Sequence, residues 1–247
     1  CWDYHAASAD WTTVFSQLAK LGLKEYQQFS SQNAIEKQIL EMNEQMPIHL
    51  GENTSIVEVK LDDDVITYMG ILRGLEFDEM NLAKFKAAQE ITNLFFVCNN
   101  KDTKYLLNED YSVSYNYSTQ DGKDLFVNVI SYTDCLPFNM KSSKDFGDFF
   151  VNLNRKILPM KLDLDTIWID VRNSNGAMEL VYQLTNYYKE ELDVENFKKA
   201  VKDHTVQKNC IAPDMKILFE KGYIVTDTYV DRVGDVVYSF QTTRNMC

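Results

Sequence analysis

Hydrophobic and polar residues along this chain show helical spacing in some segments and strand-like alternation in others. The same order of helical and strand-like segments occurs twice. Apolar residues at helical spacing predict a helix at about residues 33–45 and a matching one at about 144–157. A second helix is predicted at about 78–97, and its counterpart begins after Asp193, a residue that can cap it. The pattern therefore predicts two copies of one structural unit.

Strict alternation of apolar and polar residues predicts strands after each helix. In the second copy, Ile167, Ile169 and Val171 alternate with three residues that we expect on the outward face, namely Trp168, Asp170 and Arg172. In the first copy Ser55, Val57 and Val59 are expected to point inward. Partner strands follow at about 65–72 and 177–184, and a hairpin follows each second helix.

Each copy thus reads α-β-β-α-β-β, which predicts an α+β fold with helices on one face of an antiparallel sheet. We expect an N-terminal tether and helix at residues 1–32, a first repeat at 33–135 and a second repeat at 140–247. Leu136, Pro137, Phe138 and Asn139 are interpreted as the linker.

Sliding the chain against itself by 112 positions supports the duplication. Between residues 47 and 135, 18 of 89 positions are identical to their counterparts, where ordinary composition gives roughly 5 or 6. The identities include a proline, a glycine and both cysteines of each copy. One visible departure is Asp110, which stands where the second copy has Gly222.

The cysteines indicate which disulfide crosslinks each copy. Duplication favours Cys98 with Cys135 and Cys210 with Cys247, because an ancestral single unit could only have paired with itself. Such disulfides imply an oxidising compartment, whereas the alternative of buried free thiols would fit a cytosolic protein.

Cys1 stands apart from both pairs. A chain that begins at cysteine and otherwise looks exported resembles a mature bacterial lipoprotein after removal of its signal peptide, so we expect a lipid on Cys1. The alternative is that the sequence simply starts here.

The formal net charge of −12 repels nucleic acid and anionic lipid, and favours either solubility or a basic partner. We therefore expect no nucleic-acid binding, and contact with a membrane only through the N-terminal lipid.

No catalytic residue, cofactor site or metal site is identified. The nucleophile, phosphate-loop and metal motifs that we sought are missing, and the Asp62–Asp64 triplet lacks the spacing of a calcium loop. Asp227 replaces Tyr115 on the inward face of the hairpin. A buried lone carboxylate there would be costly, so we favour a solvated sheet edge for it.

The sequence from Pro159 onward carries a further resemblance. "LPMKLDLDTIWIDVRNSNGAMELVYQLTN", a helix with a cysteine, "LFEKGYIVTDTYVDRVGDVVYSF" and a closing cysteine resemble a group of exported proteobacterial proteins of unknown activity. That group combines a helix ending at proline, a strand with threonine and a Gly-Tyr strand before a cysteine. The resemblance covers each repeat from about Pro47 or Pro159 and implies no catalytic residue.

These observations predict a non-catalytic binding or interaction protein attached to the periplasmic side of the bacterial cell envelope, such as a toxin-neutralising or assembly factor. Its partner would be another protein, and Trp168, Asp170 and Arg172 are the expected contacts. Alternatives are an enzyme with a site between the repeats, a structural envelope component, or a secreted protein. An enzyme should show a pocket with convergent polar groups, and a binding protein an exposed aromatic and apolar patch.

Overall fold

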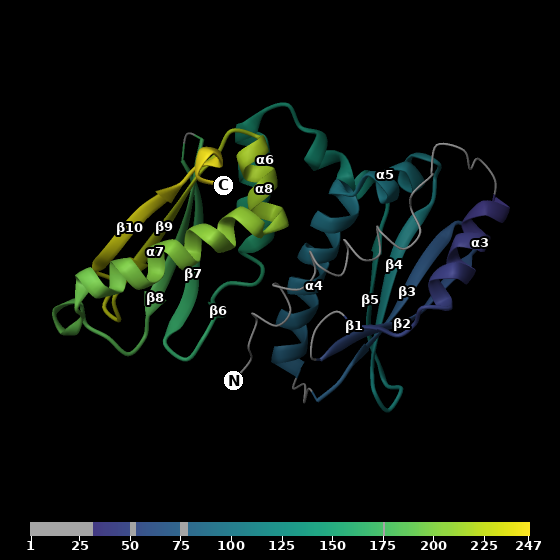
Figure 1. Cartoon of the computed structure of the whole chain (residues 1–247), viewed down its shortest axis with the longest axis horizontal. Coiled ribbons are helices and arrows are strands. Elements are labelled where there is room, and N and C mark those ends of the chain that lie inside the picture. Colours follow the sequence, from purple (N-terminus) through teal and green to yellow (C-terminus); the bar gives the residue numbers. More distant parts are fainter. Residues whose placement is uncertain (1–31, 50–52, 75–78, 175) are drawn as a thin grey trace. The chain divides into compact units, whose positions relative to one another are not determined.

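The computed structural model describes residues 32–49, 53–74, 79–174 and 176–247. The chain divides into two compact units, with the boundary between Asn139 and Met140 (Figure 1). Of the predicted tether and helix at residues 1–32, all but Gln32, which opens the first described helix, lie outside the described residues.

The first unit has the predicted order of elements plus a short strand, β1, a short helix, α5, and a 3-10 helix after the last strand. Its elements are α3 (Gln32–Asn43), β1 (Ile48–His49), β2 (Thr54–Asp62), β3 (Val65–Leu72), α4 (Glu79–Asn99), α5 (Lys101–Asn108), β4 (Ser112–Thr119), β5 (Asp124–Ile130) and the 3-10 helix Tyr132–Asn139.

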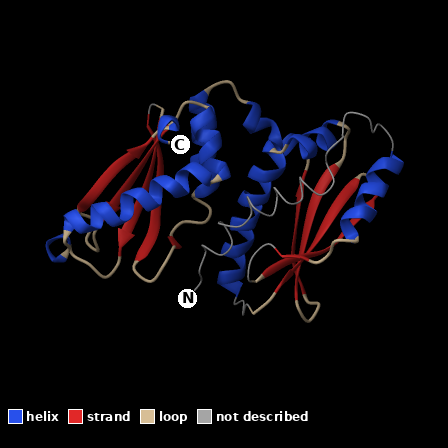
Figure 2. Ribbon diagram, in the orientation of Figure 1, coloured by secondary structure: helices blue, strands red, loops and turns tan. Residues whose placement is uncertain are grey.

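The second unit repeats this order (Figure 2). Its elements are α6 (Ser143–Asn154), β6 (Met160–Lys161), β7 (Thr166–Ser174), β8 (Ala177–Leu184), the 3-10 helix Lys189–Glu191, α7 (Val194–Ile211), α8 (Pro213–Glu220), β9 (Ile224–Val230), β10 (Val236–Thr242) and the 3-10 helix Arg244–Met246.

The helices begin where the sequence supplies caps. The predicted cap Asp193 is confirmed, because its carboxylate accepts the backbone N–H of Asn196 at 3.1 Å. Ser142 caps α6 and Asn100 caps α5 in the same way. Helices α3 and α6 end at Asn43 and Asn154, two to three residues earlier than predicted and several residues before Pro47 and Pro159.

Each sheet has five strands, in the order β1-β2-β3-β4-β5 and β10-β9-β8-β7-β6. The prediction of a wholly antiparallel sheet is wrong, because β3 pairs with β4 in parallel and β8 pairs with β9 in parallel. In each unit two helices lie between these strands and carry the chain back to the end of the sheet at which the first of the two strands began, and such a crossover makes neighbouring strands parallel.

Residues aligned across neighbouring strands share one face of the sheet. In the first unit Val59 is aligned with Tyr68, and Tyr68 with Tyr115. Ile35 and Ile39 of α3 belong to the same hydrophobic cluster as Val59. In the second unit Tyr182 stacks on Tyr229, and Phe197 of α7 contacts Tyr229 edge-on. The helices therefore cover the face that carries these aromatic residues.

A β-bulge interrupts the first long strand of each sheet. The register shifts between Ile56 and Glu58 in β2, and between Trp168 and Asp170 in β7. The extra residue, Val57 or Ile169, reverses the alternation. Ile56 and Trp168 therefore point toward the helices with Val59 and Val171, which contradicts the predicted alternation of inward Val57 and outward Ile56.

The turns before β4 and β9 explain the difference between Asp110 and Gly222. Both residues have positive φ, 64° at Asp110 and 82° at Gly222. Glycine adopts this conformation freely, and aspartate is one of the few other residues that tolerate it. The substitution therefore preserves the turn.

Both predicted disulfides are confirmed, with Cα–Cα distances of 5.1 Å for Cys98–Cys135 and 5.2 Å for Cys210–Cys247. Cys135 lies in a 3-10 helix after β5, and Cys247 follows the 3-10 helix after β10, so the strands end before the cysteines. The predicted linker is part of the first of these helices, where Phe138 is buried against Phe95.

Candidate functional site

The structure separates Trp168 from the two residues with which it was predicted to form a binding site. Trp168 is only 8% exposed, so the prediction of an exposed anchor is wrong. Its indole Nε1 donates a hydrogen bond to the backbone oxygen of Asp170 at 2.9 Å. The bulge at Ile169 is the physical reason, because it turns Trp168 to the helix-covered face.

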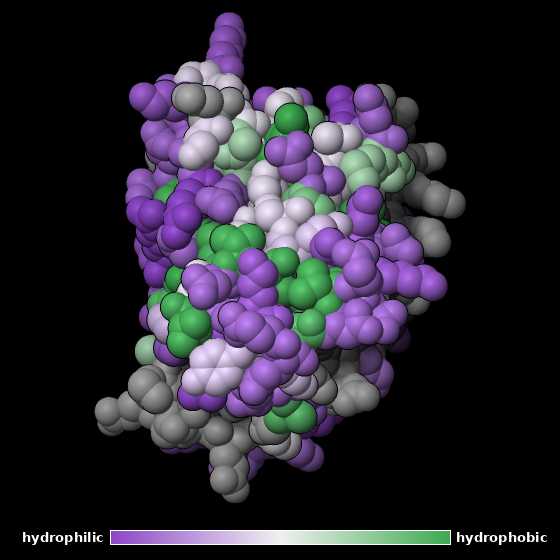
Figure 3. All heavy atoms as spheres, turned by 90° about the vertical axis from the view of Figure 1, so that its left-hand side faces the viewer, coloured by the Kyte–Doolittle hydropathy of each residue, from purple (hydrophilic) through white to green (hydrophobic). Residues whose placement is uncertain are grey.

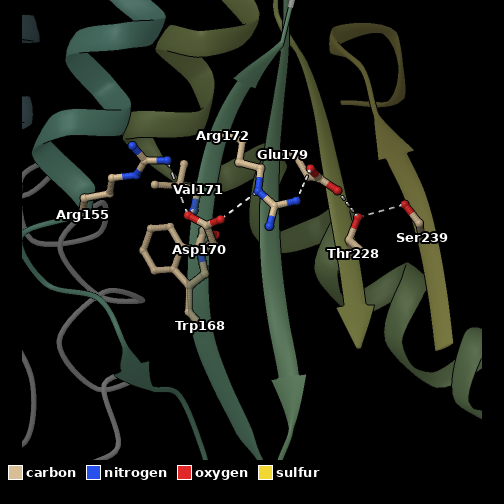
Figure 4. Close-up of polar contacts among 8 residues, drawn as sticks. All are labelled: Arg155, Trp168, Asp170, Val171, Arg172, Glu179, Thr228 and Ser239. Atoms are coloured by element: carbon tan, nitrogen blue, oxygen red, sulfur yellow. Dashed lines mark hydrogen bonds and ion pairs between the residues drawn. The ribbon is translucent and has the colours of Figure 1, made fainter. Parts of the chain in front are cut away.

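Asp170 and Arg172 do lie on the open face of the second sheet, where they begin a row of polar contacts across four strands (Figure 4). Arg172 donates to Asp170 at 2.7 Å and to Glu179 of β8 at 3.4 Å. The row continues through the hydroxyls of Thr228 in β9 and Ser239 in β10, at 2.9 and 3.1 Å. Arg155, just after α6, adds an ion pair with Asp170 at 3.7 Å.

This polar row is specific to the second unit. At the corresponding positions the first unit has an ion pair between Lys60 and Glu58, at 3.1 Å, but continues with Thr67, Asn116 and Val127. The hydrogen bond to Asp170, reinforced by Glu179, raises the pKa of Arg172 although partial burial opposes the rise. Such exposed pairs contribute about 0–1 kcal/mol each, so the row orients side chains more than it stabilises the fold.

A second surface feature lies at the turn between β9 and β10. We call it the hairpin-tip patch, and it consists of Tyr187, Tyr188, Arg232, Val233 and Val236. Val233 and Val236 are 64% and 51% exposed, and the two tyrosines are 38% and 36% exposed. Figure 3 views the molecule from the left-hand side of Figure 1, the side of β10, and shows hydrophobic groups among hydrophilic ones.

Several contacts hold the two segments of the patch together. The backbone N–H of Arg232 donates to the carbonyl of Tyr187 at 3.0 Å, and the guanidinium lies 4.6 Å from the centre of the Tyr188 ring. Gln183 donates to the carbonyl of Arg232 at 3.1 Å. The carboxylate of Asp231 accepts backbone N–H groups from Lys189, Val233 and Asp235.

The pKa of Asp231 reflects the hydrogen bonds that its carboxylate accepts from the backbone. Burial tends to raise it, but the backbone hydrogen bonds outweigh burial and hold it below the usual value for aspartate. The patch is therefore supported by a carboxylate that stays ionised. It is a preorganised surface of aromatic, arginine and aliphatic groups, the residue types that supply most binding energy at protein interfaces.

The hairpin-tip patch was not predicted from the sequence, because its residues come from two segments more than 40 positions apart. A signal was nevertheless present. In the first unit the positions of Arg232, Val233 and Val236 are occupied by Gln120, Asp121 and Asp124. The first hairpin tip thus carries polar residues where the second carries valines. A turn that is merely exposed to solvent does not require valines, so this difference points to a contact made by the second hairpin.

A third feature is a buried polar cluster beneath α7. Asp227 is 0% exposed, so the prediction of a solvated sheet edge is wrong; β9 is an interior strand between β8 and β10. Asn209 of α7 donates to one carboxylate oxygen at 2.8 Å, and the hydroxyl of Tyr182 donates to the other at 3.2 Å. Asn209 also donates to Thr242 at 3.3 Å.

Burial raises the pKa of Asp227 to about 6, and the hydrogen bonds from Asn209 and Tyr182 only partly oppose that rise. The pKa of Tyr182 rises well above its usual value, first through burial and then through the charge of Asp227. These polar groups converge as catalytic groups do. However, the carboxylate has no solvent-accessible surface, so a substrate cannot reach it in this conformation.

Other candidate chemistry is accounted for as follows. His49 is hydrogen-bonded to the hydroxyl of Ser55 at 2.8 Å, and His204 is exposed on α7. Across the described ranges, no group of three or more His, Cys, Asp or Glu side chains could hold a metal ion. Within those same ranges, none of the helices has the length and apolar character needed to span a bilayer. Cys1 lies outside the described residues.

Comparisons with known proteins give only distant likenesses. No model of a known protein family matches the sequence, and no curated protein is similar to it. The solved structures that resemble part of the chain include the following three.

The first is a protein from Pseudomonas aeruginosa named as a secreted protein, which is 12% identical with a TM-score of 0.38. It covers 42% of this chain and 90% of its own.

The other two are type II secretion system pilotins. The pilotin from Vibrio vulnificus is 11% identical with a TM-score of 0.34, and covers 40% of this chain and 86% of its own. The pilotin from Vibrio cholerae is 12% identical with a TM-score of 0.35, and covers 42% of this chain and 92% of its own. Each match spans about the length of one unit, and likenesses this distant carry no argument about function.

Proposed function

We propose that this protein is a non-catalytic binding protein on the periplasmic side of the bacterial cell envelope, and that it contacts another protein through the hairpin-tip patch. The observation that carries the proposal is the patch itself. Tyr187, Tyr188, Val233 and Val236 are each exposed, and hydrogen bonds hold the two segments that carry them next to each other.

The physical argument concerns the cost of exposing such groups. Valines at an exposed turn gain nothing from water, whereas burial in an interface is worth about 25 cal/mol for each Å² of apolar surface removed from water. The segments are already ordered by the contacts of Asp231 and Gln183, so binding would lose little conformational entropy. The patch therefore has the properties of an anchor for a partner.

The negative charge of the protein indicates which kind of partner surface would bind it best. The chain carries a formal net charge of −12, and Glu190, Glu191 and Asp235 flank the patch in sequence. The surrounding field favours a protein surface that presents apolar residues flanked by lysine or arginine. The two disulfides support an oxidising compartment such as the periplasm.

The test compares two double variants of the full-length protein in its native host. In the first, Val233→Asp and Val236→Asp give the second hairpin the aspartates that the first hairpin has at these positions. The matched control is Val127→Asp with Val129→Asp, which places the same charges on exposed valines of β5 in the first unit. Partners are cross-linked in intact cells and quantified by mass spectrometry.

We expect the wild-type protein and the control to recover the same partner, and the hairpin variant to recover at least about tenfold less, equivalent to about 1.4 kcal/mol. Equal recovery by all three proteins would refute a role for the patch. Mass spectrometry of the N-terminal peptide from the same cells separately tests the expectation of a lipid on Cys1, and an unmodified cysteine would contradict that expectation.

A further inference from the structure

The buried carboxylate of Asp227 distinguishes the cores of the two units. It lies on the helix-covered face of β9, fully buried, with hydrogen bonds from Asn209 and Tyr182. Its aligned residue on β10 is Phe240, and its aligned residue on β8 is Leu180. The described contacts to this carboxylate come from an amide and a phenol, which are neutral groups, and both neighbouring strands present apolar residues to it.

The first unit is built differently at the same position. Tyr115 replaces Asp227, and its ring stacks on Tyr68 at 5.2 Å between ring centroids and on Tyr117 at 6.5 Å. The residue corresponding to Asn209 is Val97, which is fully buried. One fold therefore occurs twice in this chain, once with a buried carboxyl group at this position and once with a buried tyrosine.

The other charged and titratable groups of this region do not neutralise Asp227. Tyr182 of β8 is affected by the charge of Asp214 on α8 as well as by Asp227. Tyr229 of β9 is affected by both Asp227 and Asp163, which lies before β7. Lys208 of α7 interacts with Asp163. The charged groups that act on the two tyrosines include Asp163 and Asp214, which carry the same sign of charge as Asp227 and so offer it no compensating charge.

We propose that Asp227 makes the second unit a pH-responsive module, in which protonation of this buried carboxyl group consolidates the packing of α7 on β9, and ionisation near neutral pH loosens it. The first unit has Tyr115 at this position and therefore lacks this pH-responsive carboxyl group. A charged Asp227 can be hydrated only if α7 moves away from the sheet, because Asn209 and the α7 side chains around Tyr229 cover it.

The direction of the pH dependence follows from linkage. The carboxyl group has a pKa of about 6 in the folded protein and about 3.9 in an unfolded chain. Below about pH 4 both states hold the proton, and the carboxyl group costs nothing. As pH rises from about 4 to about 6 the folded state retains a proton that the unfolded state has released, so stability falls; above that range the full cost of ionisation persists.

The experiment measures unfolding of the second unit within the whole chain. Trp168 is buried in the second unit, and replacement of Trp2 and Trp11 by phenylalanine makes its fluorescence the sole tryptophan signal. Urea unfolding is followed at pH values from 4 to 8 for this reporter protein, for Asp227→Asn and for the matched control Asp203→Asn. Asp203 is an exposed carboxylate on α7, so the control removes the same charge.

We expect the unfolding constant of the reporter protein, divided by that of Asp227→Asn, to rise about fiftyfold between pH 4 and pH 8. Two pKa units correspond to about hundredfold in all, and about half of the unfolded chains have already released this proton at pH 4. The same ratio taken against Asp203→Asn should stay within about threefold. Amide hydrogen exchange in α7 and β9, corrected for intrinsic rates, should be faster in the reporter protein than in Asp227→Asn at pH 8 and similar at pH 4. A flat ratio for Asp227→Asn would overturn the proposal.

A direct titration keeps the inference testable if Asp227→Asn fails to fold. The carboxyl carbon of Asp227 is followed by NMR in the wild-type protein as pH is raised. A midpoint between about 5.5 and 7 supports the proposal. A midpoint below about 4.5 overturns it, because a carboxyl group with the ordinary pKa of aspartate is already ionised over nearly all of the interval from pH 4 to pH 8 and could not change the packing of α7 there.

Discussion

Replacement of Trp168 by alanine removes one of the largest buried side chains of the second unit. Because Trp168 is 8% exposed, the variant loses nearly all of the apolar burial of the indole and leaves a cavity on the helix-covered face of β7. Tryptophan-to-alanine changes at such sites cost about 3–5 kcal/mol of unfolding free energy. The hydrogen bond from Nε1 to the carbonyl of Asp170 accounts for about 1 kcal/mol of that cost.

Urea unfolding followed by far-UV circular dichroism measures this loss, since the variant lacks the fluorescent reporter. Trp168→Phe is the matched variant: it keeps an aromatic ring but lacks the indole N–H, and should lose only about 1–2 kcal/mol. Arg172→Ala on the open face should lose less than about 1 kcal/mol. A loss below about 1 kcal/mol for Trp168→Ala would refute the assignment of this residue to the core.

Three further predictions concern the fold. Gly147→Ala should lower stability by about 1–3 kcal/mol in thermal unfolding, because the added methyl group would collide with the Tyr223 hydroxyl; an unchanged melting temperature would show that this contact is not close. Replacing both Cys210 and Cys247 by alanine should cost up to about 4 kcal/mol in urea unfolding, from the 37-residue separation that the bridge closes, and a loss below about 1 kcal/mol would contradict this. Gly222→Val should be less stable than Gly222→Asp by about 1 kcal/mol, because a β-branched residue is strained at positive φ; equal stabilities would argue against that turn.

The architecture could be predicted from the sequence because its signals are local or repeated. The duplicated cysteine spacing specified both disulfides, and the predicted partner strands at 65–72 and 177–184 coincide with β3 and β8. The parallel pairing of β3 with β4 was missed although the helical connection between them implies it. That miss was one of interpretation rather than of missing signal.

The face of Trp168 could not be predicted in the same way. A bulge adds one residue to a strand, and nothing in the alternation of β7 shows where the addition falls. A shift of one residue exchanges the two faces of a strand. Trp168 therefore lies in the core, contrary to the prediction, whereas Asp170 and Arg172 lie on the solvent-exposed face, as predicted. The burial of Asp227 was misjudged because it depends on the position of β9 inside the sheet, which is a tertiary property.

The candidate site was missed for a related reason. Tyr187 and Tyr188 join Val233 and Val236 only through contacts such as the hydrogen bond from Arg232 to Tyr187. The sequence nevertheless held half of the signal, because the valines replace Asp121 and Asp124 of the first unit. A position-by-position comparison of the two hairpins would have indicated where the second unit had gained a surface that the first lacks.

The central claim, that the hairpin-tip patch contacts another protein, is tested most directly by photo-cross-linking in living cells. A photoreactive amino acid is placed at Tyr188 in the second unit, and in a separate variant at Tyr132, an exposed tyrosine of the first unit. The account predicts an adduct of one defined mass from position 188 that is absent from position 132 and is lost when Val233 and Val236 are changed to aspartate. The absence of any adduct at position 188, or the same adduct at both positions, would contradict it.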